Sequence, residues 1–279
     1  MIPDIQTNTL YLSARLPSRY PGFFSHFEKA LNQMQITYEL LEGTNDVWAV
    51  DYMPIQVHEQ HFVQFMYRPD YLRNSPSARL SITNATPLCK AMNLPFVSSN
   101  LVVDGGNVVA TSHKVILCDK LVKENSGYTK GQIWRELQAL FETDKVLLIP
   151  EDPLDPVGHA DGMVRFVDAD TVLVNDYGDS DAELKDHLRH IFRKAGLEII
   201  PLPYNPYSNK GKWDAAGIYM NYLHMQQGLV VPVFNRKEDE TAVRLLEEVF
   251  SGQPIITVDS RELAKEGGIL NCISWNIIQ

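Results

Sequence analysis

A histidine and an aspartate stand two positions apart in the stretch Gly158-His159-Ala160-Asp161-Gly162. An imidazole beside a carboxylate can hold a substrate cation next to a proton carrier. The alternating residues Met163 to Val167 follow at once and predict a strand, and residues i and i+2 of a strand point to the same face. If that strand begins at His159, both side chains share one face of it. A surface turn is the competing interpretation, because short motifs match many unrelated sequences.

Two further aspartates lie in settings that suit a charged site. Asp51 lies within the largely apolar stretch Trp48 to Pro54, and a buried carboxylate needs a partner, either in the protein or on a ligand cation. Asp104 opens the sequence Asp104-Gly105-Gly106-Asn107. A helix cap or turn at Asp51 and a tight turn at Asp104 are equally compatible with the local sequence.

The three cysteines are Cys89, Cys118 and Cys272, and their spacing fits neither a disulfide framework nor a structural zinc site. Cys89 and Cys118 lie in apolar patterns that predict packing positions. Cys272 follows Gly267-Gly268 and an apolar pair. It is either a buried small hydrophobe or a nucleophile whose thiolate is made available by a nearby imidazole or cation.

Composition limits the classes of function. The chain has 279 residues, of which 44% are hydrophobic and 22% charged, the profile of an ordinary soluble globular protein. Its net charge of −10 disfavours nucleic acid as a partner and is compatible with a cationic substrate. No leader pattern and no apolar run of membrane-spanning length is found, so we expect a cytoplasmic protein without a membrane partner. The oligomeric state is left open, and a homo-oligomer is compatible with the sequence.

The elements that must position these residues repeat in the order strand, turn, strand, helix, strand. Helices are predicted after Pro21 and Thr129, before Gly196, and around Val243 to Phe250. The stretch Arg68 to Ser81 is predicted to be loop. The predicted strands are Thr9–Ala14, Ile36–Leu41, Ile55–His58, Phe62–Tyr67, Asn100–Val109, Lys114–Asp119, Val146–Ile149, Met163–Val167, Thr171–Asn175, Leu197–Pro201, Ile218–His224, Leu229–Phe234 and Ile255–Val258.

Polar residues recur near the first strand of each unit, at intervals of 53, 55, 62 and 51 positions. They are Asp51, Asp104, His159, Asn221 and Cys272. We expect these five side chains to converge on one axis. The C-terminal strand that carries Cys272 is predicted to pair with the N-terminal strand, which closes a ring of five units and leaves no exposed sheet edge between them.

Four motifs occur in the order found in the guanidine-modifying enzymes: Trp48-x-x-Asp51-x-x-Pro54, Asp104-Gly105-Gly106-Asn107, Gly158-His159-x-Asp161, and Gly267-Gly268 with Cys272. The chain resembles in particular the agmatine deiminase and bacterial-type peptidylarginine deiminase branch. The resemblance implies that residues 1–279 form a single α/β domain, a five-bladed α/β propeller of ββαβ units called the pentein fold. Its active site would lie on the pseudo-fivefold axis.

The resemblance also implies catalytic roles. Cys272 would be the nucleophile that attacks the central carbon of a guanidinium group. His159 would protonate the departing amine and then deprotonate the water that hydrolyses the covalent thiouronium intermediate. Asp104 would hold His159 in orientation.

The substrate site implied by the resemblance is a clamp for a small cationic guanidine compound. Asp51 and Asp161 would bind the guanidinium nitrogens in charge-assisted hydrogen bonds, with Trp48 and Asn107 as further substrate-binding residues. No metal and no organic cofactor is expected. The implied reaction is hydrolytic deimination, with agmatine as the leading substrate, giving ammonia and a ureido product within polyamine metabolism.

Departures from the family pattern leave other functions open. Val50 and Asn271 stand where relatives usually carry arginine and histidine, and fewer residues than usual follow Cys272. An amidinotransferase would pass the same intermediate to an amine, and a noncatalytic protein would only bind guanidine compounds. A metal hydrolase built on His159 and Asp161 lacks a third ligand at a suitable spacing.

One further segment precedes Trp213. The polar residues 204–212 are predicted to form a surface loop, with a lid over the substrate as the alternative.

Overall fold

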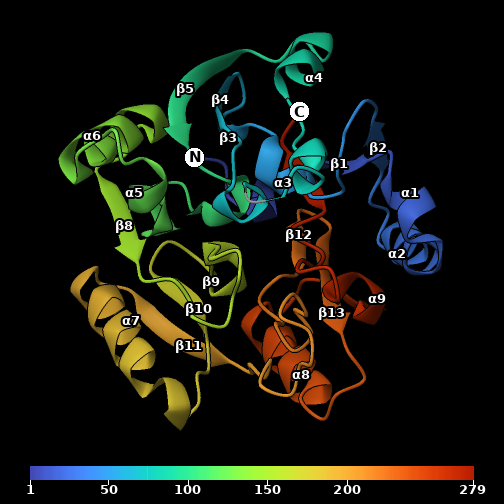
Figure 1. Cartoon of the computed structure of the whole chain (residues 1–279). Coiled ribbons are helices and arrows are strands. Elements are labelled where there is room, and N and C mark those ends of the chain that lie inside the picture. The colour runs from blue at the N-terminus through green and yellow to red at the C-terminus, as the bar shows by residue number, and fades with distance from the viewer. Residues whose placement is uncertain (74) are drawn as a thin grey trace.

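The structure is a computed structural model that describes residues 1–73 and 75–279, and within these residues the strands form five three-stranded sheets. The sheets lie around a common centre like the blades of a propeller (Figure 1). They are β15-β1-β2, β3-β4-β5, β6-β7-β8, β9-β10-β11 and β12-β13-β14. In each sheet the middle strand pairs antiparallel with the first strand and parallel with the third.

The strand bounds follow the repeated order along the chain. They are β1 (Thr9–Ser13), β2 (Tyr38–Leu41), β3 (Ile55–His58), β4 (His61–Met66), β5 (Phe96–Val102), β6 (Val109–Ala110), β7 (Lys114–Cys118), β8 (Lys145–Ile149), β9 (Val164–Phe166), β10 (Thr171–Asn175), β11 (Glu198–Leu202), β12 (Leu223–Met225), β13 (Gly228–Val233), β14 (Ile255–Asp259) and β15 (Ser274–Ile277).

A helix connects the middle and outer strands of each blade, because two parallel neighbours need a crossover. These helices are α2 (Pro21–Gln33), α4 (Thr86–Ala91), α5 (Lys120–Glu124) with α6 (Lys130–Phe141), α7 (Ala182–Lys194) and α8 (Asp239–Val249). The longer ones form the outer rim of the ring (Figure 1). Short helices complete the chain: α1 (Leu16–Arg19), α3 (Ala49–Tyr52), α9 (Arg261–Ala264), η1 (Asp4–Gln6), η2 (Asp70–Leu72), η3 (Ala78–Ser81), η4 (Gly105–Asn107), η5 (Ala160–Gly162) and η6 (Asp179–Asp181).

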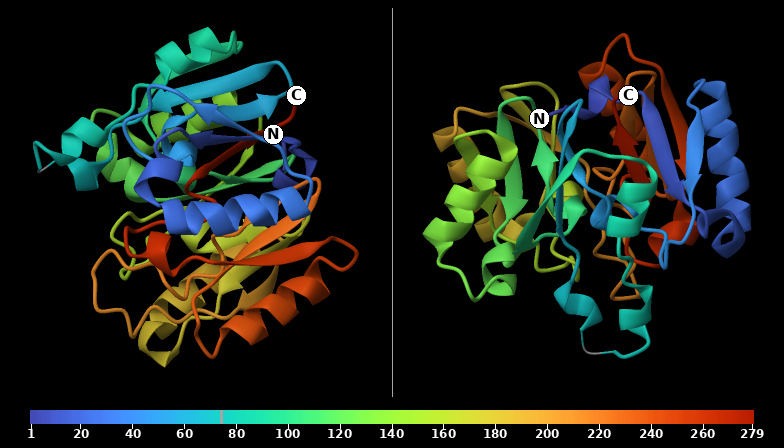
Figure 2. Two further views of the ribbon diagram at one scale, coloured as in Figure 1. Left: turned by 90° about the vertical axis from the view of Figure 1, so that its right-hand side faces the viewer. Right: turned by 90° about the horizontal axis from the view of Figure 1, so that it is seen from above.

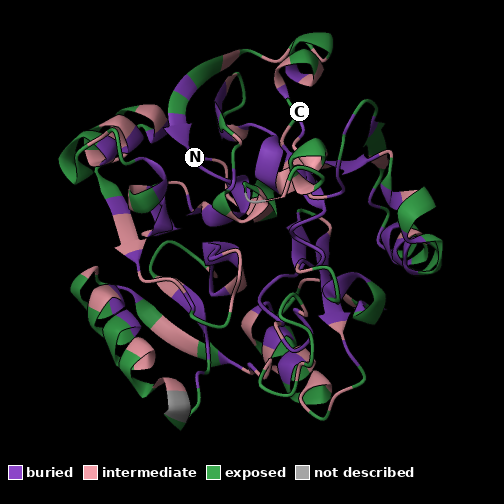
Figure 3. Ribbon diagram, viewed as in Figure 1, coloured by how far each residue is buried: buried purple, intermediate pink, exposed green. Residues whose placement is uncertain are grey.

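Local sequence accounts for the rim helices. Thr129 caps α6 through a capping box with Gln132, which satisfies two backbone donors at the start of that helix. Gly196 follows α7 with φ +70°, the left-handed conformation that ends helices. Each rim helix turns an apolar stripe toward its sheet and its polar face outward, so the outer helix surfaces are exposed and the inner strands buried (Figure 3).

Pairing between β15 and β1 closes the ring, with Tyr11 opposite Trp275 and Leu12 opposite Ser274. The expected five-bladed α/β propeller, and its closure by strands near the two ends of the sequence, are therefore confirmed. The first strand of every blade lies nearest the centre (Figure 1). The polar residues of interest come just before this strand in the sequence.

Several predicted boundaries were wrong. Residues 100–109 are not one strand, because β5 ends at Val102 and β6 begins only at Val109, with η4 between them. The segment from Ile218 to Tyr222 is not a strand, because it contains only a single β-bridge between Ile218 and Tyr204 before β12 begins at Leu223. The predicted loop Arg68 to Ser81 contains η2 and η3, and its residue 74 lies outside the described residues.

The geometry predicted for the segment Gly158 to Gly162 was also wrong. His159 and Asp161 do not share one face of a strand, because η5 begins directly after His159 and β9 starts only at Val164. Cys272 likewise precedes β15 and does not lie within it. His159, Asp161 and Cys272 therefore lie in short segments just ahead of β9 and β15.

The two faces of the ring differ. The segment with η2 and η3 projects from one face, and both ends of the chain lie toward the other (Figure 2). Among the described residues, the helices are too short or too polar to cross a membrane.

Candidate active site

The turns that precede β3, β6, β9, β12 and β15 meet at the centre of the ring. They carry Asp51, Asp104, His159, Asn221 and Cys272, one from each blade. His159 contacts both Asp51 and Asp104, and the Asn221 side chain accepts a hydrogen bond from the backbone N–H of Cys272 at 3.2 Å. The convergence predicted from the spacing of these five residues is thus present.

His159 is a buried imidazole held between two carboxylates. Its Nε2 lies 3.0 Å from Oδ2 of Asp104, and its Nδ1 lies 3.5 Å from Oδ1 of Asp51. Burial alone would lower the pKa of His159, but Asp51 and the hydrogen bond to Asp104 together raise it to about 9. The imidazole is therefore protonated at neutral pH, ready to donate a proton.

Asp51 is buried at the end of α3, next to the imidazole. Burial raises the pKa of its carboxyl to about 7, with the nearby Asp104 and Asp161 acting in the same direction, although His159 and the backbone N–H of Gly106 oppose them. That N–H donates to Oδ1 of Asp51 at 3.1 Å. Asp51 therefore changes charge close to neutral pH.

Two glycines make this close packing possible. A Cβ atom on Gly106 would lie 2.7 Å from Oδ1 of Asp51 and 2.8 Å from Nδ1 of His159, and one on Gly105 would lie 1.9 Å from the carbonyl oxygen of Val50. Real side chains do not approach so closely. Gly106 thus makes room for the charged groups and Gly105 for the backbone of Val50, and neither glycine is required by a left-handed turn.

Asp161 is the centre of a second group of contacts. Its Oδ2 accepts hydrogen bonds from the side-chain amides of Asn271 at 2.7 Å and Asn221 at 3.0 Å. The Sγ atom of Cys272 lies 3.8 Å from the same oxygen. The two amides fix the carboxylate beside the thiol, and Asn271, which departs from the family pattern, is one of the residues that holds it.

The Cys272 thiol is buried and surrounded by negative charge. Burial, Asp161 and Asp51 all raise its pKa well above the usual range. The thiol is therefore neutral as the site stands. A cation placed between the two aspartates would offset their charge and make the thiolate accessible.

A pocket of about 710 Å³ opens onto Cys272, His159 and Asp51. Its walls are rich in aromatic side chains and also carry charges of both signs. The aromatic residues are Trp48, Tyr67, Tyr71 and Trp213, and further charged lining residues are Arg19, Asp46, Lys265 and Glu266. Gly268 admits the Trp48 ring, because a Cβ there would lie 2.5 Å from Cζ3 of Trp48.

The sequence-predicted residues fall into two groups. Cys272, His159, Asp51 and Trp48 line the pocket, and the contacts given above attach Asp104 and Asp161 to them. Asn107 stands apart: its amide bonds the backbone N–H and C=O of Cys118 at 2.7 and 3.2 Å. Its Oδ1 also accepts a hydrogen bond from the backbone N–H of Ala160, in the neighbouring blade, at 3.3 Å. Asn107 is buried and is not among the pocket-lining residues described, so its geometry supports a structural role within its blade and between two blades.

Sequence reasoning missed several contributors. Tyr71 lies in the segment predicted only as loop, and its ring centroid is 6.2 Å from that of His159. Trp213 follows the segment predicted as a surface loop and forms another wall. Lys120 was not singled out at all, although it is buried and lies 3.3 Å from Asp104. No local pattern marks these positions, because Tyr71 and Lys120 lie in the crossover connections of their blades and Trp213 lies in the connection from one blade to the next.

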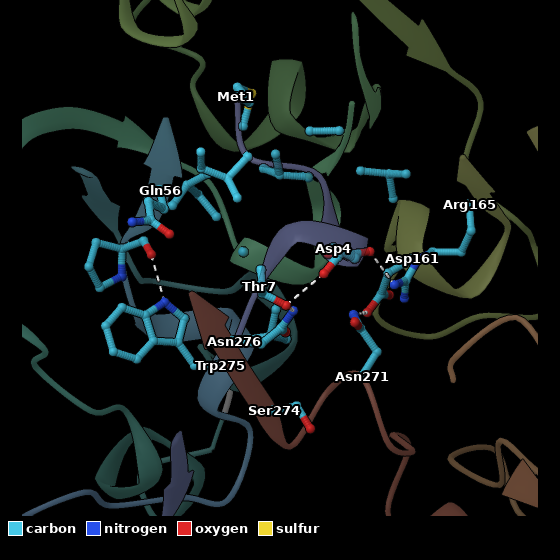
Figure 4. A pocket seen from close by; sticks show the side chains of 18 residues that line it. Met1, Asp4, Thr7, Gln56, Asp161, Arg165, Asn271, Ser274, Trp275 and Asn276 are labelled. Atoms are coloured by element: carbon cyan, nitrogen blue, oxygen red, sulfur yellow. Dashed lines mark hydrogen bonds and ion pairs between the residues drawn. The ribbon is translucent and has the colours of Figure 1, made fainter. Parts of the chain in front are cut away.

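A second, smaller cavity of about 90 Å³ lies behind Asp161, next to the first residues of the chain (Figure 4). Arg165 lines it, forms an ion pair with Asp4 and lies 4.8 Å from the Tyr222 ring centroid. Asn271, the residue before Cys272, also lines this cavity and donates a hydrogen bond to Asp161. The N-terminal segment thus covers the side of the ring opposite the pocket.

Five ββαβ blades around a polar axis define the pentein class of α/β propellers. The sequence profile of the Porphyromonas-type peptidyl-arginine deiminase family matches residues 24–277. The chain belongs to that family.

Similar proteins agree with this placement. An agmatine deiminase of Pseudomonas aeruginosa (strain UCBPP-PA14) is 24% identical over 203 residues, which are 62% of this chain and 54% of that protein. This chain therefore spans little more than half the length of that relative, and about three fifths of other curated relatives.

Solved structures share the fold at low sequence identity. The C. jejuni agmatine deiminase superposes with a TM-score of 0.80 at 18% identity, covering 100% of this chain and 95% of that one. The agmatine deiminase of Enterococcus faecalis gives 0.80 at 18% identity, covering 99% and 94%. DDAH from Pseudomonas aeruginosa gives 0.58 at 13% identity, covering 98% and 100%.

Proposed function

We propose that this protein is a hydrolase that deiminates a small guanidine compound, with agmatine as the leading substrate. The observation that carries the proposal is the arrangement of a thiol, two carboxylates and an imidazolium around one pocket. Cys272 lies 3.8 Å from Asp161, and Asp51 lies 3.5 Å from His159. Membership of the family and the agmatine deiminases among its relatives support the same activity.

Substrate binding would work through charge. A guanidinium ion carries one positive charge and planar N–H groups that match carboxylate oxygens in paired hydrogen bonds. Placed between Asp51 and Asp161, it would offset the negative charge that keeps the Cys272 thiol protonated. Substrate binding would thus generate the nucleophile, and the thiol proton would leave to solvent.

The chemical steps then divide between Cys272 and His159. The thiolate sulfur forms a bond to the central guanidinium carbon, and the protonated imidazole gives its proton to the departing nitrogen, which leaves as ammonia. The neutral imidazole next takes a proton from water as the water oxygen bonds to the same carbon. The carbon–sulfur bond then breaks as the hydroxyl proton of this intermediate passes to solvent, which releases the ureido product and restores the thiolate.

The raised pKa of His159 suits this order of events. At about 9 it leaves the imidazole protonated when substrate arrives, which the first step requires. Its nearest polar neighbour on the pocket side is Asp51, through Nδ1, while Nε2 stays bound to Asp104. Asp104 therefore acts as the orienting group, and Nδ1 is the atom that would exchange protons with substrate and water.

The test is direct assay of product formation. Purified protein is incubated separately with agmatine, free arginine and a peptide with an internal arginine, and ammonia and ureido product are measured, with Cys272→Ser as the inactive control. We expect equal amounts of ammonia and ureido product from agmatine. Ammonia only when an amine acceptor is added would favour the amidinotransferase, and no product from any guanidine compound would overturn the proposal.

A further inference from the structure

Lys120 is a buried lysine directly behind the imidazole of His159. It is the first residue of α5, and its side chain is 3% exposed. Its Nζ donates to the carbonyl oxygen of Val157 at 2.6 Å and to Oδ2 of Asp104 at 3.3 Å. Lysine is rarely buried unless paired, so these contacts explain how it is tolerated there.

One carboxylate oxygen serves two cationic groups. Oδ2 of Asp104 accepts from Lys120 and also from Nε2 of His159 at 3.0 Å. The other oxygen, Oδ1, is buried and has no hydrogen-bond partner among the described residues. Lys120 and His159 therefore compete for the same lone pairs and the same negative charge.

We propose that Lys120 is a positioning residue: by sharing one carboxylate oxygen of Asp104 with His159, it limits how firmly that carboxylate holds the imidazole proton. Without Lys120 the whole charge of Asp104 would act on His159. An imidazole bound more tightly in its protonated form would still protonate the leaving amine. It would seldom be neutral, and only the neutral form can accept a proton from water.

The charges around the pair agree with this role. Burial alone would lower the pKa of Lys120, but Asp104, Glu124 and Asp70 raise it above its usual value, so the ammonium stays charged. Lys120 in turn opposes the rise in the pKa of His159 that the carboxylates cause. The groups that face Lys120 are Asp104, Asp70 at 3.6 Å, Glu124 at 3.8 Å and the Tyr71 ring at 5.3 Å. The groups that face His159 are Asp51, Asp104, Lys120, Tyr71 and, at its backbone, Asp155.

Lys120 also ties together parts of the pocket wall. Val157 lines the pocket two residues before His159, and Asp70 adjoins Tyr71 in the projecting segment. The backbone N–H of Asp70 also donates to Glu124 at 3.2 Å. The Lys120 ammonium group thus contacts Asp104, which is the hydrogen-bond partner of His159. It also contacts Val157 and Asp70, which belong to two segments of the pocket wall.

The experiment measures the pKa of His159 in Lys120→Met by NMR titration of protein labelled with ¹⁵N at the histidine side chains. His159→Gln identifies the signal among the eight histidines. We expect the pKa of His159 to rise by about one unit, because a cation that opposed protonation is lost. A pKa that stays the same or falls would overturn the proposal.

The matched control is Lys114→Met. Lys114 is also buried, with its Nζ bonded to Asp170 at 2.6 Å and to the carbonyl oxygen of Ala169 at 2.5 Å, but it lies outside the pocket lining. Lys114→Met therefore removes a buried ammonium group that does not contact Asp104. The control should leave the pKa of His159 unchanged, and an equal rise in both variants would count against a specific role for Lys120.

Folding could complicate Lys120→Met, because Asp104 and Glu124 lose a counter-charge. The second variant is Lys120→Met/Glu124→Gln, which removes one charge of each sign and keeps the Asp104–His159 pair; Glu124→Gln alone is its reference. The pKa of His159 should again rise relative to that reference. No rise in this folded variant would overturn the proposal as well.

The kinetic consequence rests on the proposed function, whereas the titration does not. If the wild-type protein deiminates agmatine, Lys120→Met should lower kcat near neutral pH more than it changes KM, and covalent adduct on Cys272 should accumulate and be visible by mass spectrometry. Failure of the wild-type protein to release ammonia would reject the function and leave the titration result standing. A raised pKa with unchanged kcat would reject the catalytic consequence alone.

Discussion

The Sγ atom of Cys272 lies 3.8 Å from Oδ2 of Asp161, an oxygen that already accepts two amide hydrogen bonds. The sulfur of the proposed nucleophile and a carboxylate are therefore neighbours. This relationship disfavours the thiolate until a cation arrives, which protects the cysteine from reacting without substrate. It also makes the two residues separable by experiment.

Replacing Asp161 by Asn should have opposite effects on binding and on thiol reactivity. Loss of the carboxylate should weaken agmatine binding about 100-fold, since a buried charged partner is removed. The pKa of the Cys272 thiol should fall, because Asp161 is one of the groups that raise it. Calorimetry would measure the affinity, and the rate of alkylation by iodoacetamide at pH 8 would measure the thiol.

The control for that substitution is Asp152→Asn. Asp152 is another buried carboxylate, bonded to Tyr204 at 2.6 Å, and it does not line the pocket. Neither affinity nor alkylation rate should change in it. Slower alkylation in Asp161→Asn would show that the assigned electrostatic relationship is wrong.

Replacing His159 by Ala should slow turnover strongly and preserve binding. We expect kcat to fall about 10³-fold, the usual contribution of a general acid and base. The Kd for agmatine should stay the same or decrease, because a positive charge beside Asp51 is removed. Steady-state kinetics, with binding measured in a Cys272→Ser background, would separate the two quantities.

His224→Gln is the matched histidine control, since His224 is buried and bonded to Gln253 at 2.9 Å but is not part of the pocket lining. It should retain wild-type kcat. If His159→Ala weakened binding as much as Asp161→Asn does, the division of roles between these two residues would be mistaken.

Substrate affinity should depend on pH through Asp51. Its pKa of about 7 means that the carboxylate is increasingly protonated as pH falls below neutrality. Binding of agmatine to Cys272→Ser should therefore weaken by about tenfold for each pH unit below 7. Calorimetry from pH 5.5 to 8.5 would show this, and Asp51→Asn should bind weakly with a nearly flat profile across the same range.

Replacing Gly106 by Ala should damage the site through space alone. The added Cβ would lie 2.7 Å from Asp51 and 2.8 Å from His159, so at least one of them must move. We expect a loss of about 100-fold in kcat/KM, the cost of displacing a reacting group by roughly 1 Å. Gly127→Ala is the control, because no atom lies within 4 Å of a Cβ there; equal activity in the two variants would refute the steric argument.

Stability of the unliganded protein should fall as pH rises from about 5 to 9. In this range the folded state holds protons that the unfolded chain releases, because the pKa of Asp51 is raised to about 7 and that of His159 to about 9. The contribution from His159 is fully present below its unfolded pKa of 6.5 and is lost as pH rises through 9. Chemical denaturation at several pH values would measure the free energy of unfolding.

The double variant Asp51→Asn/His159→Gln lacks both titrating groups and should show a flatter pH dependence over this range. Both residues must be replaced because they titrate as a pair, so removal of one shifts the pKa of the other. Parallel curves for wild type and double variant would exclude these groups as the source.

Much of the fold followed from the order of apolar runs. Alternation of strand and helix patterns predicted repeated units, and near-equal spacing of polar residues placed Asp51 and Cys272 on a common axis with others between them. The break inside residues 100–109 escaped prediction, because apolar residues on both sides of Asp104 gave one continuous strand pattern. The break occurs because β5 pairs with β4 whereas β6 pairs with β7, and no local sequence pattern indicates this change of partner.

Site residues could be predicted where they belong to a recognisable sequence motif. They could not be predicted where a side chain from another part of the chain reaches the centre of the ring. His159 and Asp161 were found through their glycine-flanked motif, although the strand argument for their shared face was wrong. Lys120 gave no signal, because a lysine at the start of a short helix is usually solvated. Only the three-dimensional packing of α5 against the turn before η4 brings it to Asp104.

Pairing of β15 with β1 has a consequence for when the protein becomes active. This pairing joins strands that are far apart in the sequence, and we expect it to form late because long-range closure is slow. Cys272 lies two residues before β15, so a partly folded ring would have the imidazole and carboxylates near their places but no positioned sulfur. Catalysis would then begin only when the last blade is completed, and activity would serve as a direct measure of correctly closed molecules in a refolding experiment.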